Sequence, residues 1–531
     1  MLSRLLKNPQ GDVILSAAKD LLVLLSKRSS RCFAALSMTG ALFQRPGRFV
    51  VILLAAFLGI APSASARVFL RWTEPSLPRA QSLGVRDLVV EWEPRARLIV
   101  EAKRQGYRVY AEVIPGQASG AAEAAAKEGL AGIFIKSAAV GNVSSGAAGL
   151  VEKLQRTHPS LVVRLLDPGG KQPQMRGSIV VDKRGVLAVS SPTEQPWIDS
   201  NVAFIRFERA IHPHVNPLVS FAWNLTDPIE QRYGPPVADY ELAIAEAGSF
   251  HADVILPLDK NLQDGLAAGN ARAFEEWKQI SRYISFYAHD PAGSAAQPVG
   301  NVGVVTDAYQ NSYEAVNLMA RHNISFRYIR AGDLSPSSIK GLALVAVFGQ
   351  RQGAAENSVL HFAEAGGVAV LVGPAVSLSS SSFRLLRKNA QSALYAAGKG
   401  KIAEIEPPIT DPEAFARDVW RLLSPAEREL TLWNALTTLA SAYQDRLDVY
   451  LNLVNYSGSP LRVQVRMKGI FSEIQAETPE RGCCETVRPV TSGNFTEFVV
   501  PAFSVGARVR LRSGLADASH PRPEYPVAAK K

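Results

Sequence analysis

Several apolar, strand-like segments in the first half of the chain end in residues that can do acid–base chemistry. Glu91 follows the run LVV, Glu112 follows RVYA, and a stretch with helical spacing lies between them. A carboxyl group acts as a general acid when it is protonated and as a nucleophile or base when it is ionised. Hydrolysis of a glycosidic bond is one reaction that needs such a pair of carboxyl groups.

Other strand-like segments also end in polar or aromatic side chains. In chain order these ends carry Trp72, Glu91, Trp92, Glu112, Lys136, Asp167, Arg206, Glu208, Trp223, Asn224 and Asp259. Solvated strand ends would be polar without any function, and the tryptophans could pack beneath loops. Flat aromatic faces beside carboxylates also suit sugar rings, which present apolar C–H faces and polar rims. We therefore treat the set as a candidate carbohydrate site and expect no metal and no cofactor in it.

Two pairs of carboxylates fall on neighbouring segments: Glu91 with Glu112, and Asp167 with Glu208. Adjacent strands lie about 4.8 Å apart, so either pair is close enough for joint chemistry. Arg206 and Glu208 are two residues apart and would share one strand face, where the cation favours an ionised carboxylate. A structural ion pair is the alternative. We assign Asp167 and Glu208 as the catalytic pair and the other strand-end residues to substrate binding.

Alternating strand-like and helical segments must position these side chains. Eight strand-like segments occupy residues 68–72, 87–92, 108–113, 132–136, 161–167, 202–208, 218–224 and 252–259. The alternation predicts a parallel sheet, and eight strands within residues 67–294 predict a closed (β/α)8 barrel whose site lies at the carboxyl ends of its strands. Residues 177–191 predict an additional pair of short strands.

The remaining segments predict two further domains. Residues 298–405 alternate buried strands with amphipathic helices, which favours a flavodoxin-like, doubly wound α/β domain. Residues 406–440 read as a helical connector, and alternating runs in 441–513 predict a small antiparallel β-sandwich. The Pro-rich tail at 514–531 is typical of disorder. The predicted fold class is therefore α/β, with a TIM barrel, a doubly wound domain and a β-sandwich.

The N-terminal residues predict export. Arg45 and Arg48 precede an apolar run from Phe49 to Ala61, and Ala64-Ser65-Ala66 forms an A-x-A cleavage signal. The run is shorter than the roughly 20 residues that span a bilayer, although a retained anchor is the alternative. We interpret 38–66 as a signal peptide cleaved near Ala66, giving a periplasmic or extracellular protein. Residues 1–37 resemble a translated intergenic element and read as a mis-annotated extension.

Charge and spacing exclude several other functions. The chain has a formal charge of +10, but residues 1–66 hold 8 basic and 2 acidic residues, which leaves +4 on the remainder. We therefore expect no nucleic-acid partner. The His-Pro-His run at 212–214 has no evident third metal ligand, and the glycines at 300–312 do not form a dinucleotide fingerprint. The adjacent Cys483 and Cys484 could form a ring disulfide, stay reduced or link chains.

The order of these domains resembles the beta-galactosidases whose barrel precedes an amidotransferase-like trimerisation domain and a β-sandwich. The segment VLHFAEAGGVAVLVGP is similar to the helix, Gly-Gly turn and strand of that middle domain. LDVYLNLVNYSGSP and VVPAFSVGARVRL resemble the final sandwich. The resemblance implies a carbohydrate substrate or ligand and a homo-oligomer assembled through the middle domain.

The chain departs from that family at its catalytic positions. The fourth strand-like segment ends in Lys136 and the seventh in Trp223 and Asn224, where the family carries glutamates. The middle domain lacks the G-x-C-x-G nucleophile motif, so we expect no amide transfer. Two hypotheses follow: an exported glycoside hydrolase-like enzyme using carboxylates at the barrel mouth, or a non-catalytic carbohydrate-binding or envelope protein on a hydrolase-derived fold.

Overall fold

The structure is a computed structural model, and the part described here has gaps. It comprises residues 66–93, 97–137, 144–168, 174–175, 180–183, 186–189, 201–213, 215–223, 232–292, 296–349, 354–373, 383–457 and 459–513. The predicted extension, the signal peptide before Ala66, the candidate site residue Asn224 and the tail at 514–531 lie outside these ranges. Within them, no helix is both long enough and apolar enough to cross a membrane.

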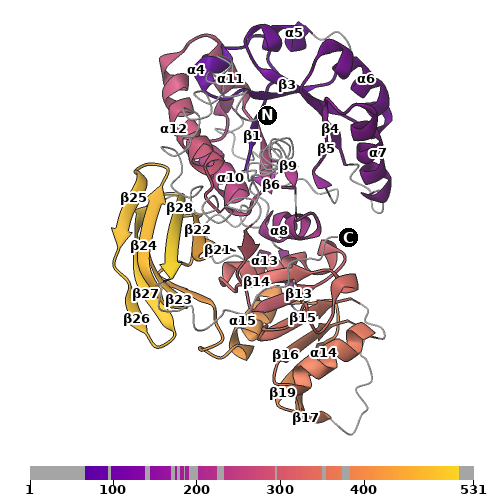
Figure 1. The fold of residues 1–531 in the computed structure, drawn as a ribbon, viewed down its shortest axis with the longest axis vertical. Coiled ribbons are helices and arrows are strands. Elements are labelled where there is room, and N and C mark those ends of the chain that lie inside the picture. Colours follow the sequence, from indigo (N-terminus) through magenta and orange to yellow (C-terminus); the bar gives the residue numbers. More distant parts are fainter. Residues whose placement is uncertain are drawn as a thin grey trace, which may run out of the picture. The chain divides into compact units, whose positions relative to one another are not determined.

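A closed barrel of parallel strands forms the first domain, as the alternating pattern predicts. Its strand order is β1–β11–β9–β5–β4–β3–β2, and β1 pairs with both β11 and β2 to close it. The strands are β1 (Val68–Arg71), β2 (Asp87–Glu91), β3 (Arg108–Val113), β4 (Gly132–Lys136), β5 (Val162–Leu166), β9 (Leu218–Ser220) and β11 (Asp253–Pro257). Figure 1 shows α5 (Arg97–Arg104), α6 (Ala118–Glu128) and α7 (Ser144–Thr157) in an arc outside β3, β4 and β5.

The barrel interior is filled by alternate residues of its strands. Phe69, Val89, Tyr110, Phe134, Leu166, Leu218 and Ile255 form one buried cluster with seven members, one from each strand. The rings of Tyr110 and Phe134 stack 4.9 Å apart. Because successive side chains of a strand alternate in direction, the residues two positions further along, including Glu91 and Glu112, also face the inside of the barrel. Val89 and Tyr110 therefore face the barrel interior, as the direction expected for both glutamates requires.

The sixth predicted strand is wrong. Residues 202–208 belong to α8 (Val202–Ile211), and the described barrel therefore has seven strands instead of eight. The segment VAFIRFERAI is apolar at 202, 204, 205, 207 and 211, which satisfies a helix as well as a fully buried strand. A short apolar run does not distinguish the two by periodicity. The predicted extra pair of strands is present as the hairpin β7 (Val180–Lys183) and β8 (Val186–Val189).

Among the described residues, three further helices lie in the C-terminal part of the barrel domain. They are α10 (Val237–Ser249), α11 (Lys260–Ala267) and α12 (Ala271–Ala288). Asp259 begins α11 as its N-cap, and Asn270 begins α12 in the same way. Caps of this kind satisfy the first backbone N–H groups of a helix. The sequence therefore fixes the starts of both helices locally.

The second domain is an α/β domain built on a seven-stranded sheet. Its order is β14–β13–β15–β16–β19–β18–β17, in which the first five strands are parallel and β18 pairs antiparallel with both of its neighbours. The strands are β13 (Val302–Val305), β14 (Phe326–Ile329), β15 (Leu344–Phe348), β16 (Val368–Val372), β17 (Phe383–Lys388), β18 (Ser392–Ala397) and β19 (Gly400–Ile405). Its helices are α13 (Tyr313–Arg321), α14 (Ala354–Glu364) and α15 (Pro412–Leu422).

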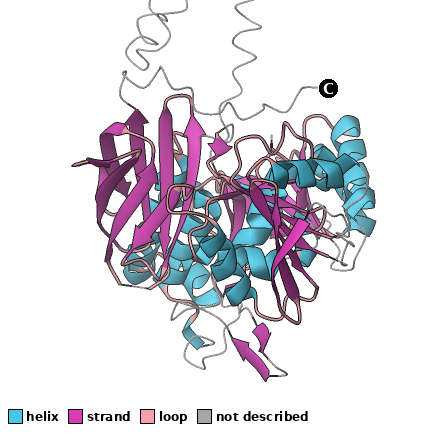
Figure 2. Ribbon diagram, turned by 90° about the horizontal axis from the view of Figure 1, so that it is seen from below, coloured by secondary structure: helices cyan, strands magenta, loops and turns pink. Residues whose placement is uncertain are grey.

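The third domain is an antiparallel β-sandwich, and Figure 2 shows it as a group of strands with no helix among them. One sheet has the order β12–β21–β22–β28–β24–β25 and the other β20–β23–β27–β26. The edge strand β12 (Gln297–Pro298) lies where the predicted barrel and α/β segments meet, and β20 (Leu430–Trp433) comes from the predicted helical connector. The other strands are β21 (Thr438–Asp445), β22 (Asp448–Asn455), β23 (Leu461–Lys468), β24 (Phe471–Thr478), β25 (Gly482–Val487), β26 (Val490–Ser492), β27 (Phe495–Phe503) and β28 (Gly506–Ser513). Cys483 and Cys484 on β25 are joined as a disulfide.

Candidate active site

Glu112 on β3 lies between two cations at the carboxyl ends of the barrel strands. Its Oε2 accepts a hydrogen bond from Arg71 of β1, and its Oε1 lies 2.7 Å from the Lys136 Nζ of β4. The Glu112 side chain is 4% exposed, whereas that of Lys136 is 45% exposed. Glu112 is therefore a buried carboxyl group, and its partner Lys136 is partly exposed to solvent.

Asp167 directly follows β5 and has an unusual backbone conformation. Its φ of 51° lies in the left-handed region, which aspartate tolerates better than most residues. The backbone N–H of Ser220 on β9 donates to its Oδ1 at 2.7 Å. The Asp167 side chain is thereby held between the ends of β5 and β9.

The protonation state of Asp167 differs from that of an exposed aspartate. Burial raises the pKa of Asp167 to about 7, and the Ser220 N–H and the Arg71 cation only partly offset this effect. The negative charge of Glu112 raises the pKa of Asp167 further, and Lys136 lowers it. Ion pairs join Glu112 to Arg71 and Lys136, and Asp167 lies near enough to all three for their charges to act on it; we treat the four residues as one cluster. Near neutral pH the cluster therefore offers a carboxyl group, Asp167, that can carry a proton, and a second carboxyl group, Glu112, that is held in ion pairs.

Glu91 lies at the same end of the barrel. It is the register partner of Glu112 in the β2–β3 pairing, and its side chain is exposed. The neighbouring Trp92 is half-buried and packs against the core outside the barrel. Glu91 is therefore available to a ligand at the mouth, whereas Trp92 serves partly as packing.

Three aromatic or acidic candidates are engaged with the protein itself. Trp72 is 1% exposed, and its Nε1 donates to the Ser76 carbonyl at 3.0 Å. The Trp223 Nε1 donates to the Pro257 carbonyl at 2.7 Å, and its ring meets that of Tyr240 edge-on at 4.9 Å. The Tyr240 hydroxyl donates to Asp259 at 2.8 Å. Trp72 is thus a core residue and Asp259 a helix cap, while the half-buried Trp223 borders the ends of β9 and β11.

The structure does not bring Glu208 and Arg206 to the barrel mouth. Both lie on α8, which contacts the second domain: the Ala203 N–H donates to Asn317 Oδ1 at 2.8 Å, and Arg206 donates to the Phe326 carbonyl. The predicted pairing of Asp167 with Glu208 rested on a sixth strand, so it is wrong for the same reason. Burial raises the pKa of Glu208 to about 7, but Glu208 does not lie where it could donate a proton to a substrate at the barrel mouth.

This burial gives a prediction about stability. Folding raises the pKa of Glu208 from 4.5 to about 7. Between these two pH values the folded protein keeps the proton on Glu208, whereas the unfolded chain has lost it. The buried Glu208 costs nothing below pH 4.5, and the stability of the protein falls between about pH 4.5 and pH 7, by up to about 3 kcal/mol in all. We expect Glu208→Gln to be more stable than the unaltered protein at pH 8 and equally stable at pH 4.

Denaturant unfolding at both pH values measures this difference. Glu275→Gln is the matched control, because the Glu275 side chain is 71% exposed on α12. A Glu208→Gln variant that is less stable than the unaltered protein at pH 8 would contradict the prediction.

Two members of the cluster, Arg71 and Ser220, are absent from the set predicted from the sequence. Reading the strand ends selected Trp72 instead of its neighbour Arg71. A signal for Arg71 exists, because it follows the inward-facing Phe69 by two residues and therefore shares its direction. Ser220 contributes only a backbone N–H, for which the side-chain sequence carries no signal.

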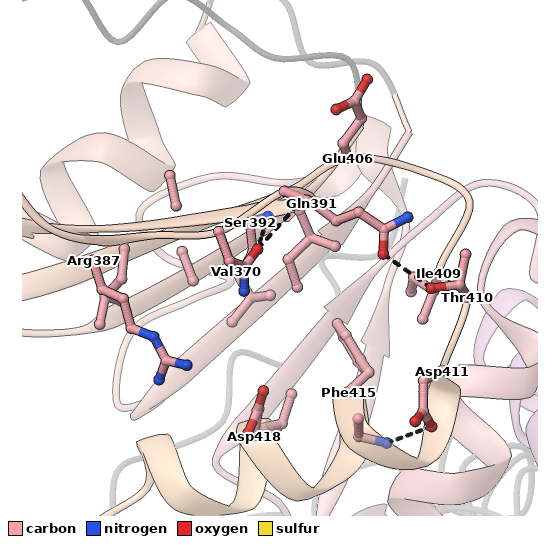
Figure 3. Close-up of a pocket in the computed structure, with 18 of the residues that line it drawn as sticks. Val370, Arg387, Gln391, Ser392, Glu406, Ile409, Thr410, Asp411, Phe415 and Asp418 are labelled. Atoms are coloured by element: carbon pink, nitrogen blue, oxygen red, sulfur yellow. Dashed lines mark hydrogen bonds between the residues drawn. The ribbon is translucent and has the colours of Figure 1, made fainter. Parts of the chain in front are cut away.

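A second concave region belongs to the α/β domain and shares no residue with the barrel cluster. It is a cavity of about 580 Å³ between β18, β19 and α15 (Figure 3). Its polar side chains are bonded to one another: Thr410 donates to Gln391 at 2.9 Å, and Asp411 caps α15 by accepting from the Ala414 N–H. Asp418 pairs with Arg421. The barrel mouth is the stronger candidate because it gathers charged groups from β1, β3, β4 and the end of β5, whereas the polar groups of this cavity close local structure.

Comparison with known proteins gives a result for the fold only. The sequence matches no protein family model and no curated protein. Among solved structures it is similar to alpha-L-fucosidase isoenzyme 2 from Paenibacillus thiaminolyticus, with 10% identity and a TM-score of 0.55 over 85% of this chain and 100% of that one. It is also similar to a beta-galactosidase from Rahnella sp. R3, with 10% identity and a TM-score of 0.50 over 85% and 99% of the two chains.

These similarities confirm the predicted architecture. The chain has a glycoside hydrolase-like fold, in which a parallel barrel is followed by an α/β domain and a β-rich C-terminal domain. At 10% identity they carry no residue assignments. Function must therefore be argued from the cluster at the barrel mouth.

Proposed function

We propose that this protein is an exported glycoside hydrolase-like enzyme that acts on an oligo- or polysaccharide at the mouth of its barrel. Asp167 serves as the general acid that protonates the leaving oxygen, and Glu112 serves as the ionised partner. Glu91, Lys136 and Trp223 contact sugar hydroxyls and ring faces.

The observation that carries the proposal is the different environment of two carboxyl groups in one cluster. Burial raises the pKa of Asp167 to about 7, while Glu112 forms ion pairs with Arg71 and Lys136. Glycoside hydrolysis needs one proton-bearing and one ionised carboxyl group. Environments that separate the protonation states of two neighbouring acids are typical of active sites, although structural networks also produce them.

One observation favours a second function, that of a non-catalytic carbohydrate-binding protein. Both carboxylate oxygens of Glu112 are engaged, one by Arg71 and the other by Lys136. A nucleophile or base must present a free lone pair to the sugar or to water. Glu112 would therefore have to exchange one contact on substrate binding, and the exposed Lys136 is the partner that can move.

A substrate screen separates the two functions. The protein from Arg67 onward is incubated with aryl glycosides and with plant and microbial polysaccharides, and both product release and binding are measured. The enzyme hypothesis predicts turnover of at least one glycoside class. Saturable binding of a polysaccharide without turnover of any substrate would favour the binding protein and overturn the enzymatic proposal.

A further inference from the structure

Another pocket, distinct from the barrel mouth and from the α/β cavity, lies where α8, the region around β14 and the sandwich strands β12 and β21 meet. Its volume is about 610 Å³, within the range of roughly 300–1,000 Å³ found for small-molecule sites. Four arginines line it: Arg206, Arg209, Arg327 and Arg330. Asp333 is the one acidic residue among its described lining residues, so the formal charge of that lining is +3. We call this region the arginine pocket.

Two elements place the arginines on facing walls. Arg206 and Arg209 are three residues apart on α8, a spacing that puts both on one helix face. Arg327 lies on β14, and Arg330 follows its last residue. The two walls therefore contribute arginines from the barrel side and from the α/β domain to the lining of one cavity. Arg209 also donates from Nη1 to the Pro213 carbonyl at 2.6 Å.

Arg206 is held in a fixed orientation. Its guanidinium lies 3.7 Å from the centroid of the Phe326 ring, and its Nη2 donates to the Phe326 carbonyl. Among the described residues, no carboxylate forms an ion pair with Arg206. Burial lowers the pKa of Arg206, because removing the guanidinium from water disfavours its charged form. An arginine nevertheless stays charged, and an anion in the pocket would offset the cost of that burial.

A serine-rich loop closes the wall formed by the α/β domain. The Ser335 N–H donates to Ser338 Oγ at 2.9 Å, and the Ser335 and Ser337 hydroxyls lie 2.9 Å apart. The Arg327 Nη2 donates to the Ser338 carbonyl at 3.0 Å. All three serines line the pocket. The Ser338 hydroxyl donates to the Ser335 carbonyl at 3.0 Å, which fixes the loop beside the arginines. The Ser335–Ser337 hydrogen bond uses one of two hydroxyl protons, so the other proton can be donated to an oxyanion.

We propose that the arginine pocket binds a small molecule bearing a carboxylate, sulfate or phosphate group. Guanidinium groups match these oxyanions with paired, charge-assisted hydrogen bonds. The rings of Phe207, Tyr328 and Tyr443 also line the pocket and supply apolar surface for the uncharged part of the ligand. The pocket shares no residue with the barrel cluster, so the proposal does not depend on the proposed hydrolysis.

Binding is tested on the full chain with four defined probes. Sodium sulfate, sodium phosphate and glucuronate represent the three oxyanions, and glucose is the uncharged counterpart of glucuronate. Isothermal titration and melting temperature are recorded with sodium chloride at matched ionic strength as the reference. We expect saturable binding of at least one oxyanion and a higher melting temperature, because the pocket walls come from three parts of the chain. The oxyanion that binds best identifies the ligand class.

Arg330→Gln tests the assignment to this pocket. The Arg330 side chain is 60% exposed and its ion pair with Asp333 spans 4.0 Å, so the variant should fold normally and bind the oxyanion about tenfold more weakly. Arg272→Gln is the control, since Arg272 is 89% exposed on α12 and pairs with Glu276; its affinity should be unchanged. Equal behaviour of oxyanions, chloride and glucose would overturn the proposal, as would equal weakening in both variants.

Discussion

Replacing Asp167 by asparagine is expected to lower kcat about a thousandfold or more on any glycoside that the protein hydrolyses. Asparagine has nearly the same shape and can still accept the hydrogen bond from the Ser220 N–H. It cannot carry or release the proton that a leaving sugar oxygen needs. The loss should therefore appear in kcat, with KM changed much less.

If the protein hydrolyses a glycoside, the same residue sets the pH dependence of its activity. A general acid works only in its protonated form, and burial raises the pKa of Asp167 to about 7. We therefore expect kcat/KM to fall as pH rises above about 7, in contrast to an ordinary aspartate, which would already be ionised at pH 5. Initial rates from pH 5 to pH 9 on one aryl glycoside measure this limb.

Asp264→Asn is the control for Asp167→Asn, because Asp264 is a 54% exposed aspartate on the barrel helix α11. It should retain full activity. Melting temperatures of both variants at pH 5 must match that of the unaltered protein, so that a loss of rate reflects chemistry. If Asp167→Asn keeps a kcat within a few fold of normal, Asp167 is not the general acid. Its role is then structural, in holding the chain after β5 against β9.

The sequence predicts most of the barrel because its strands obey simple patterns. Six of the eight predicted segments overlap barrel strands closely, and the seventh segment contributes Leu218–Ser220. Buried parallel strands read as short apolar runs between helical stretches, and GIFIK and RVYAEV are such runs. The inward direction of Glu112 also follows from the sequence, since Tyr110 two residues earlier is a core position.

The proposed pair of Asp167 and Glu112 could not be selected from the sequence, because the choice depends on which apolar run is a strand. An extended segment 202–208 would place Glu208 at the barrel mouth. The segment is instead helical and packs apolar residues against the second domain. Phe204, for example, meets Tyr309 with ring centroids 5.4 Å apart. Such contacts between residues a hundred positions apart leave no local pattern. The partners of Glu112 are equally non-local, as Arg71 is 41 residues away.

Replacing Glu112 by glutamine separates a catalytic carboxylate from a binding one. If Glu112 acts as nucleophile or base, Glu112→Gln should lower kcat about a thousandfold or more, because an amide can neither attack a sugar nor activate water. If Glu112 only holds a hydroxyl, the amide keeps most of the hydrogen bonding, and the change should be small and partly in KM.

Glu101→Gln provides the comparison for this variant, because Glu101 also pairs with an arginine, Arg104 at 2.7 Å, but on the outer helix α5. The removal of charge at Glu112 leaves Arg71 and Lys136 without their shared carboxylate, so melting temperature must be measured beside the rate. A stable Glu112→Gln protein with near-normal kcat would assign Glu112 to a structural ion cluster. A stable protein that keeps polysaccharide binding but has lost turnover would establish Glu112 as the ionised partner of Asp167.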